Sequence, residues 1–279
     1  ISLVNCSIVD LRGEGAGCLH VDGGTTFVQN CEFIQPGYGG GVGGEFKADS
    51  VLKNSLFVGP VHLYEHTGVT GSITFQSNTF VAPGAYSIGL GVITPVEDGE
   101  APKQIRFQDN LIQSEIVMNL GHVPREGSDV DVAAVQFKQA FRWEELGNVF
   151  QKPNQYLRFT GRNNSKLKIR LASDLNGFHR FWEQENSGSK EGIIRFRGGD
   201  LIARFRSGEN SIPIDDFRLR SDSAGYRAVP NGEDVGASID FVGPGEGYER
   251  WKKTDEYQQW LLETAELITG GIQTQAAAN

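Results

Sequence analysis

The side chains of this 279-residue chain that would most readily act as bases or metal ligands are scattered along it. His62 and His66 are four residues apart, a spacing that joins two ligands on a helix but not on the strand and turn expected here. The cysteines have no Cys-x-x-Cys spacing and add no zinc site. The sequence therefore predicts no metal site and no cofactor. The five histidines are His20, His62, His66, His122 and His179, and the three cysteines are Cys6, Cys18 and Cys31.

Paired carboxylates for acid and base catalysis are equally hard to find. Glu45 and Glu65 are the nearest candidates for such a pair on one face. The Gly-x-Ser-x-Gly elbow of a hydrolase is absent. Residues 39–44 match the string Gly-x-Gly-x-x-Gly, but a strand-like run at 45–48 follows, so a phosphate would find no helix N-terminus. We expect no catalytic residue, and enzymatic activity stays open as an alternative.

A row of polar and aromatic side chains offers binding chemistry. If the apolar residues of each predicted strand face inward, the residues between them reach the outer face of the sheet. Aromatic rings and hydrogen-bonding groups on a flat sheet suit a sugar, through stacking and bidentate contacts. Insertions at 83–103 and 113–132 are expected to wall a groove beside the row, and an ordinary solvated face is the alternative. The predicted carbohydrate-binding residues are His20, Lys47, His62, Tyr64, Gln136, Lys138, Tyr156 and Arg158.

A repeated unit must position this row of side chains, and an asparagine recurs once in each unit. An Asn follows a strand-like run six times, at spacings of 25, 24, 24, 32 and 38 residues. Three short strands in about 24 residues form one coil, and coils stack to share a continuous core. Asn suits the bend between strands because it tolerates a left-handed backbone and bonds nearby peptide groups. The predicted fold is all-β, a right-handed single-stranded parallel β-helix with a corner ladder of Asn5, Asn30, Asn54, Asn78, Asn110 and Asn148.

Two of the cysteines fall at the same point of successive repeats. Cys6 and Cys31 each follow the corner Asn, and stacked residues are about 4.8 Å apart, within reach of a disulfide. A column of small buried thiols is the other interpretation. The sequence leaves both open.

Charge and hydropathy restrict the partners. The formal net charge of −9 argues against general binding to nucleic acids or anionic membranes, because both need a basic face. No apolar run approaches the roughly 18 residues of a membrane helix, so no membrane insertion is expected in this segment. The chain opens on Ile1 and directly on a repeat, and we interpret it as part of a larger protein with an upstream domain.

The coils are expected to continue beyond residue 150. Runs at 156–159, 168–171, 193–197 and 201–206 alternate apolar and basic residues, as strands with one wet face do. The run 134–137 is interpreted as a strand in the same way. A loop or short helix is expected between Gly177 and Lys190.

The spacing of apolar residues changes in the last part of the chain. Between residues 248 and 268 apolar side chains recur every three to four residues, which predicts an amphipathic helix. An open β-helix end needs a cover, and we expect this helix to cap the last coil. The chain is thus divided into a β-helix at 1–245, a capping helix at 246–269 and a flexible tail at 270–279.

These repeats resemble a known superfamily. Residues 1–150 are similar to the right-handed parallel β-helix (pectin-lyase-like) proteins, which include pectate lyases and polygalacturonases. Asp216–Ala224 followed by Asp234–Ala237 resembles the closing segment of many bacterial β-helix repeat proteins, with Asp222 and Ser223 replacing the usual small residue and Pro. The ending Tyr248–Leu261 resembles tails of planctomycete-type bacterial proteins, some of which carry an N-terminal serine/threonine kinase domain.

The resemblance implies catalytic sets that this sequence does not reproduce. Pectate lyases need an Asp cluster for calcium, and polygalacturonases need paired and single Asp residues, a Gly-His-Gly and an Arg-x-Lys. Here Asp215-Asp216 lies in the closing segment, and Lys168-Ile169-Arg170 reverses the Arg-x-Lys order.

We therefore favour a non-catalytic binding or structural module of a larger bacterial protein. Its expected partner is a polysaccharide or other glycan at the cell envelope or outside the cell. One alternative is a polysaccharide lyase or glycoside hydrolase of the pectin-lyase-like group. Another is the sensor domain of a serine/threonine kinase-containing protein.

Overall fold

The computed structural model describes residues 1–9, 18–22, 24–36, 42–46, 49–65, 71–84, 86–92, 101–121, 130–160, 168–185, 187–209 and 211–263. Several sequence expectations fall outside these residues, including the flexible tail and much of the two insertions. The others are Lys47, His66, His122, residues 39–41, and the side chains of Glu45, Tyr64 and Glu65.

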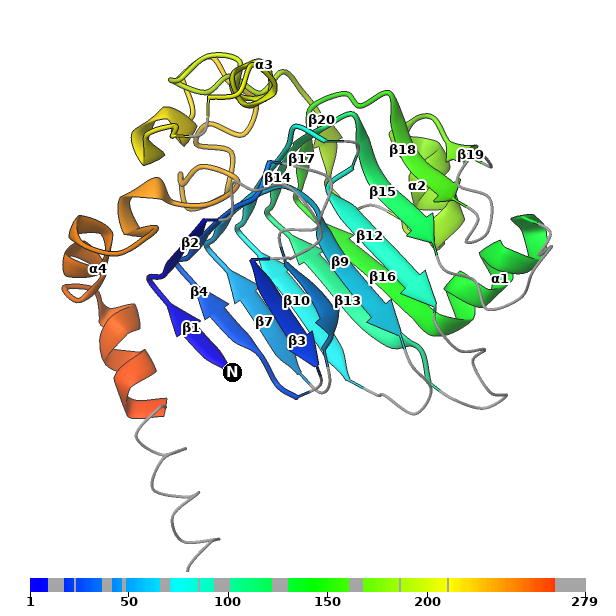
Figure 1. The fold of residues 1–279 in the computed structure, drawn as a ribbon, viewed down its shortest axis with the longest axis horizontal. Coiled ribbons are helices and arrows are strands. Elements are labelled where there is room, and N and C mark those ends of the chain that lie inside the picture. The colour runs from blue at the N-terminus through cyan, green and yellow to red at the C-terminus, as the bar shows by residue number, and fades with distance from the viewer. Residues whose placement is uncertain are drawn as a thin grey trace, which may run out of the picture.

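The strands form three stacked sheets, and each turn of the chain adds one strand to each sheet (Figure 1). The first sheet contains β1 (Ser2–Val4), β4 (Phe27–Gln29), β7 (Ser50–Lys53), β10 (Ser72–Gln76), β13 (Lys103–Gln108) and β16 (Phe141–Leu146). The second contains β2 (Ser7–Val9), β5 (Glu32–Ile34), β8 (Leu56–Val58), β11 (Thr79–Ala82), β14 (Leu111–Ser114), β17 (Val149–Phe150) and β20 (Lys190–Glu191). The third contains β3 (Leu19–Asp22), β6 (Val42–Glu45), β9 (Val61–Glu65), β12 (Ile88–Val92), β15 (Ile116–Gly121), β18 (Gln155–Thr160) and β19 (Lys168–Ala172).

Neighbouring strands run parallel. Among the described strands, the one antiparallel pair is β18 with β19. This stack of parallel strands is compatible with the predicted parallel β-helix, and the mostly-β prediction is confirmed. Corner residues that bond across neighbouring coils, four times through two side chains and once through the Ser55 backbone N–H, are 25, 24, 23, 32 and 38 residues apart.

The core fills the space between the three sheets. Phe33, Phe57 and Phe80 of the second sheet stack in one column, with ring centroids 5.3 and 5.0 Å apart. The outer face of the second sheet is also buried, because residues from Ile194 to Val242 pack on it as a second apolar cluster. Both faces of this sheet are therefore buried in its middle coils, which explains the unbroken apolar runs at Leu56–Val58 and at residues 80–82.

The corner of the coils contains two adjacent columns rather than one Asn ladder. Asn5, Asn30 and Asn54 have positive φ angles of 49°, 56° and 45°. In the next three coils this left-handed position belongs to the residue before each Asn, namely Ser77, Asp109 and Gly147.

We call the column of Asn5, Asn30 and Asn54 the outer ladder. Asn54 Nδ2 donates to Asn30 Oδ1 at 2.6 Å, and Asn30 Nδ2 to Asn5 Oδ1 at 3.4 Å. The same side chains bond the closing segment, here defined as residues 213–243. Asn54 Oδ1 accepts from the Ser238 amide at 2.6 Å, and Asn5 Nδ2 donates to the Gly243 carbonyl at 2.9 Å.

The other column faces the interior, and we call it the inner column. Each of its side chains after the first, Cys6, accepts a hydrogen bond from a backbone N–H one coil earlier. Asn78, Asn110 and Asn148 form its middle part, and each Nδ2 also donates to a backbone carbonyl of an earlier coil. The column is Cys6, Cys31, Ser55, Asn78, Asn110, Asn148 and Ser189.

The inner column accounts for the repeated cysteines. All three cysteines are free thiols, and Cys31 Sγ accepts from the Cys6 amide at 3.4 Å. Burial raises the pKa of Cys31 to about 12. Of the two interpretations, the structure has the column of thiols rather than a disulfide.

Two predicted strands are helices instead. Residues 134–137 lie within α1 (Val130–Ala140), whose buried side chains Ala133, Phe137 and Ala140 follow helical spacing. Residues 201–206 form α3 (Leu201–Arg206), where the Asp200 side chain accepts from the Ala203 amide as an N-cap. A run of four to six alternating residues fits both the period of a strand and that of a helix. An N-cap such as Asp200 and side-chain contacts between residues i and i+4 favour the helix.

The predicted strand at 193–197 is also wrong. Only Phe196 makes isolated bridges there, to Gly199 and Leu219, in an otherwise irregular stretch. The run instead packs through Ile194 and Phe196 on the outer face of the second sheet. Its apolar side chains therefore meet a sheet that is already formed rather than adding a strand to it.

The last coil is covered by α2 (Leu175–Trp182), inside the region predicted to hold a loop or short helix. Phe178 and Trp182 lie on Trp143, with ring centroids 6.0 and 6.2 Å away. Asp174 caps the helix N-terminus through the Gly177 amide at 2.7 Å. The apolar face of α2 thus closes this end of the core.

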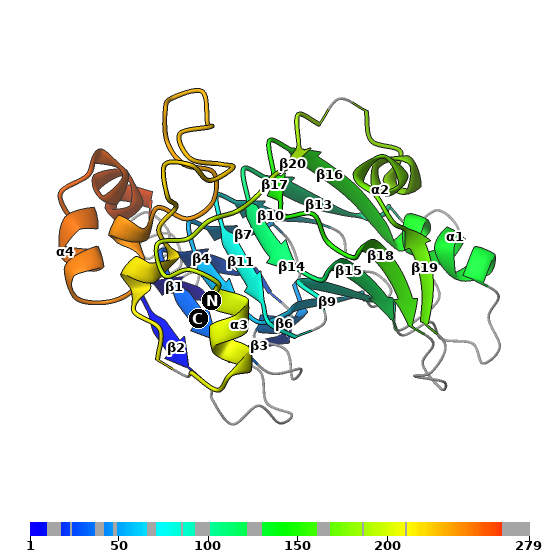
Figure 2. The same cartoon turned by 90° about the horizontal axis from the view of Figure 1, so that it is seen from above.

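The C-terminal helices do not cover the last coil, contrary to expectation. The predicted single helix is interrupted at Lys252–Thr254, between α4 (Glu246–Trp251) and the helical residues 255–263. Both parts lie beside the first three coils, next to β1 and β4 (Figures 1 and 2). An ion pair joins Glu256 to Lys53 of β7. The C-terminal helices lie on this side because the closing segment, which precedes them, runs back along the corner toward the first coil.

Candidate functional site

The outer face of the third sheet presents one residue per coil in a straight row. Backbone pairing aligns His20 with Gly43, Gly43 with His62, and His62 with Gly89. The alignment continues from Gly89 to Asn119 and on to Arg158. Polar side chains therefore stand along the stack with glycines between them.

The glycines make room for the neighbouring rings. A Cβ on Gly89 would lie 3.1 Å from His62 Nδ1 and 3.2 Å from the Tyr86 ring, and one on Gly43 would lie 3.2 Å from His62 Cβ. His62 and Tyr86 have ring centroids 5.5 Å apart, and Tyr86 Oη lies 3.3 Å from His62 Nε2. A larger residue at Gly89 would push these rings out of place.

Arg158 is held at the other end of the row. Its Nε donates to Asn119 Oδ1 at 2.9 Å, and its guanidinium carbon lies 5.7 Å from the centroid of the Tyr86 ring. Thr160 Oγ1 donates to the same Asn119 oxygen at 2.7 Å. Burial lowers the pKa of Arg158 from its ordinary value, yet a guanidinium stays protonated in proteins. The group is a fixed, half-buried cation on a sheet surface.

The structure brings together three of the eight predicted row residues. His20, His62 and Arg158 share the outer face of the third sheet. Sequence reasoning missed Tyr86 and Asn119, which join His62 to Arg158. Asn119 could have been found by continuing the outward alternation into the run at 116–121.

Three others lie elsewhere. Tyr156 is fully buried, because it faces inward on β18, and its hydroxyl donates to Glu191 Oε1 at 3.0 Å. Gln136 and Lys138 lie on helix α1, and Lys138 Nζ pairs with Glu183 Oε1 at 2.7 Å. Placing these three residues on the outer row was wrong. Lys47 and the Tyr64 side chain lie outside the described residues, so their place on the row stays a prediction.

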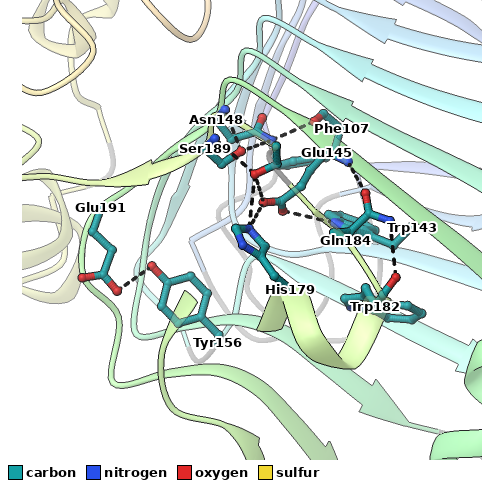
Figure 3. Close-up of polar contacts among 11 residues, drawn as sticks. Phe107, Trp143, Glu145, Asn148, Tyr156, His179, Trp182, Gln184, Ser189 and Glu191 are labelled. Carbon is teal, nitrogen blue, oxygen red and sulfur yellow. Dashed lines mark hydrogen bonds and ion pairs between the residues drawn. The ribbon is translucent and has the colours of Figure 1, made fainter. Parts of the chain in front are cut away.

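A second polar group lies at the end of the core, between β16 and α2 (Figure 3). The Glu145 side chain is fully buried and bonds His179 Nε2, the Trp143 indole N–H at 3.2 Å, and the Ser187 hydroxyl at 3.1 Å. Ser187 Oγ also lies 3.3 Å from His179 Nε2.

These residues have the types of a hydrolase triad but not its geometry. In a triad the acid and the nucleophile address different nitrogens of the imidazole, so that a proton can be relayed. Here Glu145 and Ser187 both address Nε2 of His179. The group is better suited to fix α2 on the last coil, as buried polar groups do when their partners are present.

The part of the chain that the structure describes contains neither a metal-ligand cluster nor a helix that could span a membrane. No group of three or more His, Cys, Asp or Glu side chains is placed there to hold a metal ion. None of the helices in the same residues combines the length and apolar character needed to cross a bilayer.

Comparison of the chain with models of known families, with curated proteins and with solved structures found no match. The site must therefore be interpreted from its own chemistry. That chemistry is a row of aromatic and hydrogen-bonding groups with one fixed cation.

Proposed function

We propose that the chain is a non-catalytic module that binds an extended glycan along the outer face of the third sheet. The supporting observation is the row from His20 through His62 and Asn119 to Arg158, aligned coil by coil. Coils repeat about every 4.8 Å, so a polymer lying along the stack meets polar groups repeatedly. Rings and planar hydrogen-bonding groups match the apolar faces and hydroxyls of sugars.

An acidic sugar suits the Arg158 end of this row. Asn119 occupies Nε of the guanidinium, which leaves the two terminal amino groups to face a ligand. A guanidinium recognises a carboxylate through two parallel hydrogen bonds. Uronate-containing polysaccharides are therefore the first ligands to test.

We further propose that the coils wind right-handedly and belong to the pectin-lyase-like group, as the spacing and resemblance of the repeats indicate. On this proposal the module belongs to a larger bacterial protein of planctomycete type, acting at the cell envelope or outside the cell. A sensor role beside an upstream kinase domain fits the same surface. No contact among the described residues favours a lyase or hydrolase over simple binding.

The test is a glycan-binding screen with two matched variants. Arg158→Ala removes the fixed cation, and we expect selective binding of an acidic glycan to weaken by about tenfold or more, since a charged hydrogen bond contributes about 1.5–3 kcal/mol. Arg142→Ala is the control, because Arg142 is an exposed arginine of the first sheet. Circular dichroism verifies that both variants fold. Equal binding by Arg158→Ala and the parent, or no binding to any glycan, would overturn the proposal.

A further inference from the structure

A cavity of about 540 Å³ lies between the corner of the coils and the closing segment. Its base is the corner of the third and fourth coils, at Asn54, Ser77 and Thr79. Its walls come from the closing segment, from Arg197 and from Glu256. A cavity of this size is typical of a site for a small organic molecule.

Two of the ion pairs in its lining are already complete. Lys53 pairs with Glu256, and Arg218 Nη2 donates to Asp240 Oδ1 at 2.8 Å. Hydrogen bonding to Arg218 lowers the pKa of Asp240, so this carboxylate is ionised at neutral pH. These four charges cancel within the cavity wall.

Two cations in the lining form no ion pair with a described carboxylate, although Arg197 acts on Asp240 at longer range and contributes to the lowered pKa of that carboxyl. Within the described residues, neither Arg197 nor Arg227 forms an ion pair. The Arg227 guanidinium carbon lies 5.4 Å from the centroid of the Tyr226 ring. Asp234 Oδ1 accepts a hydrogen bond from the backbone N–H of Arg227 at 2.8 Å.

Arg197 and Tyr226 also line a neighbouring hollow, together with Ser221 and the ion pair of Arg220 with Asp222. They therefore stand between two openings, where a ligand can reach both. Glu233, at the edge of the cavity, is the one lining carboxylate of the described chain that has no ion pair or side-chain hydrogen bond. Asp234 keeps its charge while it accepts that hydrogen bond, so two guanidiniums without an ion pair face two carboxylates without one in the lining. The charge of the lining is balanced, and Arg197 and Arg227 are the cations in it that can still pair with an anionic group.

We propose that this cavity binds a small organic anion, whose carboxylate or phosphate group is held by Arg197 and Arg227 and whose body lies against Tyr226. Planar guanidiniums match both anions in a bidentate manner. Such a ligand bridges Arg197 and the closing segment, so its binding stabilises the docked closing segment. The site shares no residue with the glycan row.

Isothermal titration calorimetry on the whole chain tests this with four separate probes: inorganic phosphate, glucose 6-phosphate, glucuronate and neutral glucose. We expect saturable binding of at least one anion and none of glucose. The Arg197→Ala, Arg227→Asn double variant should bind that anion about tenfold more weakly or worse. Asn is chosen at 227 because the backbone φ there is +48°, which Asn tolerates.

Two controls make the result decisive. Arg195→Ala removes a neighbouring, partly buried arginine that does not line the cavity, and its binding should equal that of the parent. Arg158→Ala should also bind normally, because a loss there would place the anion on the glycan row instead and overturn the cavity proposal. Absence of saturable binding for all three anions, or unchanged binding by the double variant, would overturn it as well. Phosphate binding without glucuronate binding would assign the site to phosphorylated ligands, and the reverse to carboxylates.

Discussion

The first three coils and the next three use the same amino acid at the same corner for different purposes. In the first three, Asn itself takes the left-handed position, and the side chains of Asn5 and Asn54 meet the closing segment. In the next three, the preceding residue takes that position, and Asn turns inward to bond backbone one coil away. Outward asparagines attach a segment to the stack, and inward asparagines attach coil to coil.

The closing segment follows this division closely. The Gly236 amide donates to the Asp109 carbonyl and the Ala237 amide to Thr79 Oγ1, both at 2.9 Å, so the fourth and fifth coils bind it without an Asn side chain. Further along, the Gly243 amide donates to the Asn30 carbonyl at 2.8 Å. The outer ladder is thus confined to the first three coils, and the fourth coil meets the closing segment through the Thr79 hydroxyl instead.

The largest expected effect is at the inner column. Asn110→Ala removes an acceptor for both nitrogens of Asn78 and a donor to the Phe75 carbonyl, all buried. Each partner left unpaired costs about 1–3 kcal/mol, so we expect the free energy of unfolding to fall by about 3–5 kcal/mol. Urea denaturation followed by circular dichroism measures it.

Glycine distinguishes the two columns. Asn30→Gly should be about 1 kcal/mol more stable than Asn30→Ala, because φ at residue 30 is +56° and alanine is strained there. At Asn110, which is not left-handed, the order should reverse, since glycine only adds backbone entropy to the unfolded chain. The same order at both positions would contradict the division into two columns.

The sequence predicted the stacked parallel strands better than the structure of the corner. Apolar alternation indicated most strands of the first 150 residues, because inward and outward faces differ sharply there. The spacing of 24 between Asn54 and Asn78 concealed a one-residue step, since the stacked neighbour of Asn54 is Ser77, 23 residues away. Asn suits both corner positions, so its identity alone could not show which one it occupied.

The site was predictable only in part, for related reasons. His62 and Arg158 follow from the strand period, whereas their connection through Tyr86 depends on a loop residue outside the repeat. The Glu145–His179 contact joins residues 34 apart in the chain. No short motif spans such a distance, and only the packing of α2 on the last coil brings them together.

A smaller effect is expected where the closing segment meets the fourth and fifth coils. Gly236 has φ +97°, and a Cβ there would lie 2.6 Å from Thr79 Oγ1 and 2.8 Å from Leu111 Cβ. We expect Gly236→Ala to cost about 2 kcal/mol through strain and crowding and to speed proteolytic cleavage within 213–243. Gly232→Ala is the matched control, because φ is +83° and nothing lies within 4 Å. Equal cleavage rates in the two variants would show that close packing at Gly236 does not hold the segment.

The smallest expected effect is a selective response to acid. Hydrogen bonding to Arg218 lowers the pKa of Asp240 below its ordinary value of 3.8. A lowered pKa in the folded state contributes stability above that ordinary value, and the contribution is lost as the pH falls through the folded-state pKa. Because the amides of the inner column do not titrate, acid should loosen the closing segment before the coils.

Hydrogen exchange measured at several pH values, corrected for intrinsic rates, checks this. Below pH 3.8, protection of the amides at 236–243 should fall, while that of the Asn110 and Asn148 amides stays unchanged. An Asp240→Asn variant has no carboxyl group to titrate there, so its closing segment should be less protected at neutral pH and respond less to acid. A parallel fall in both regions would mean that the coils and the closing segment unfold as one unit, and that their different use of asparagine does not give them separate stabilities.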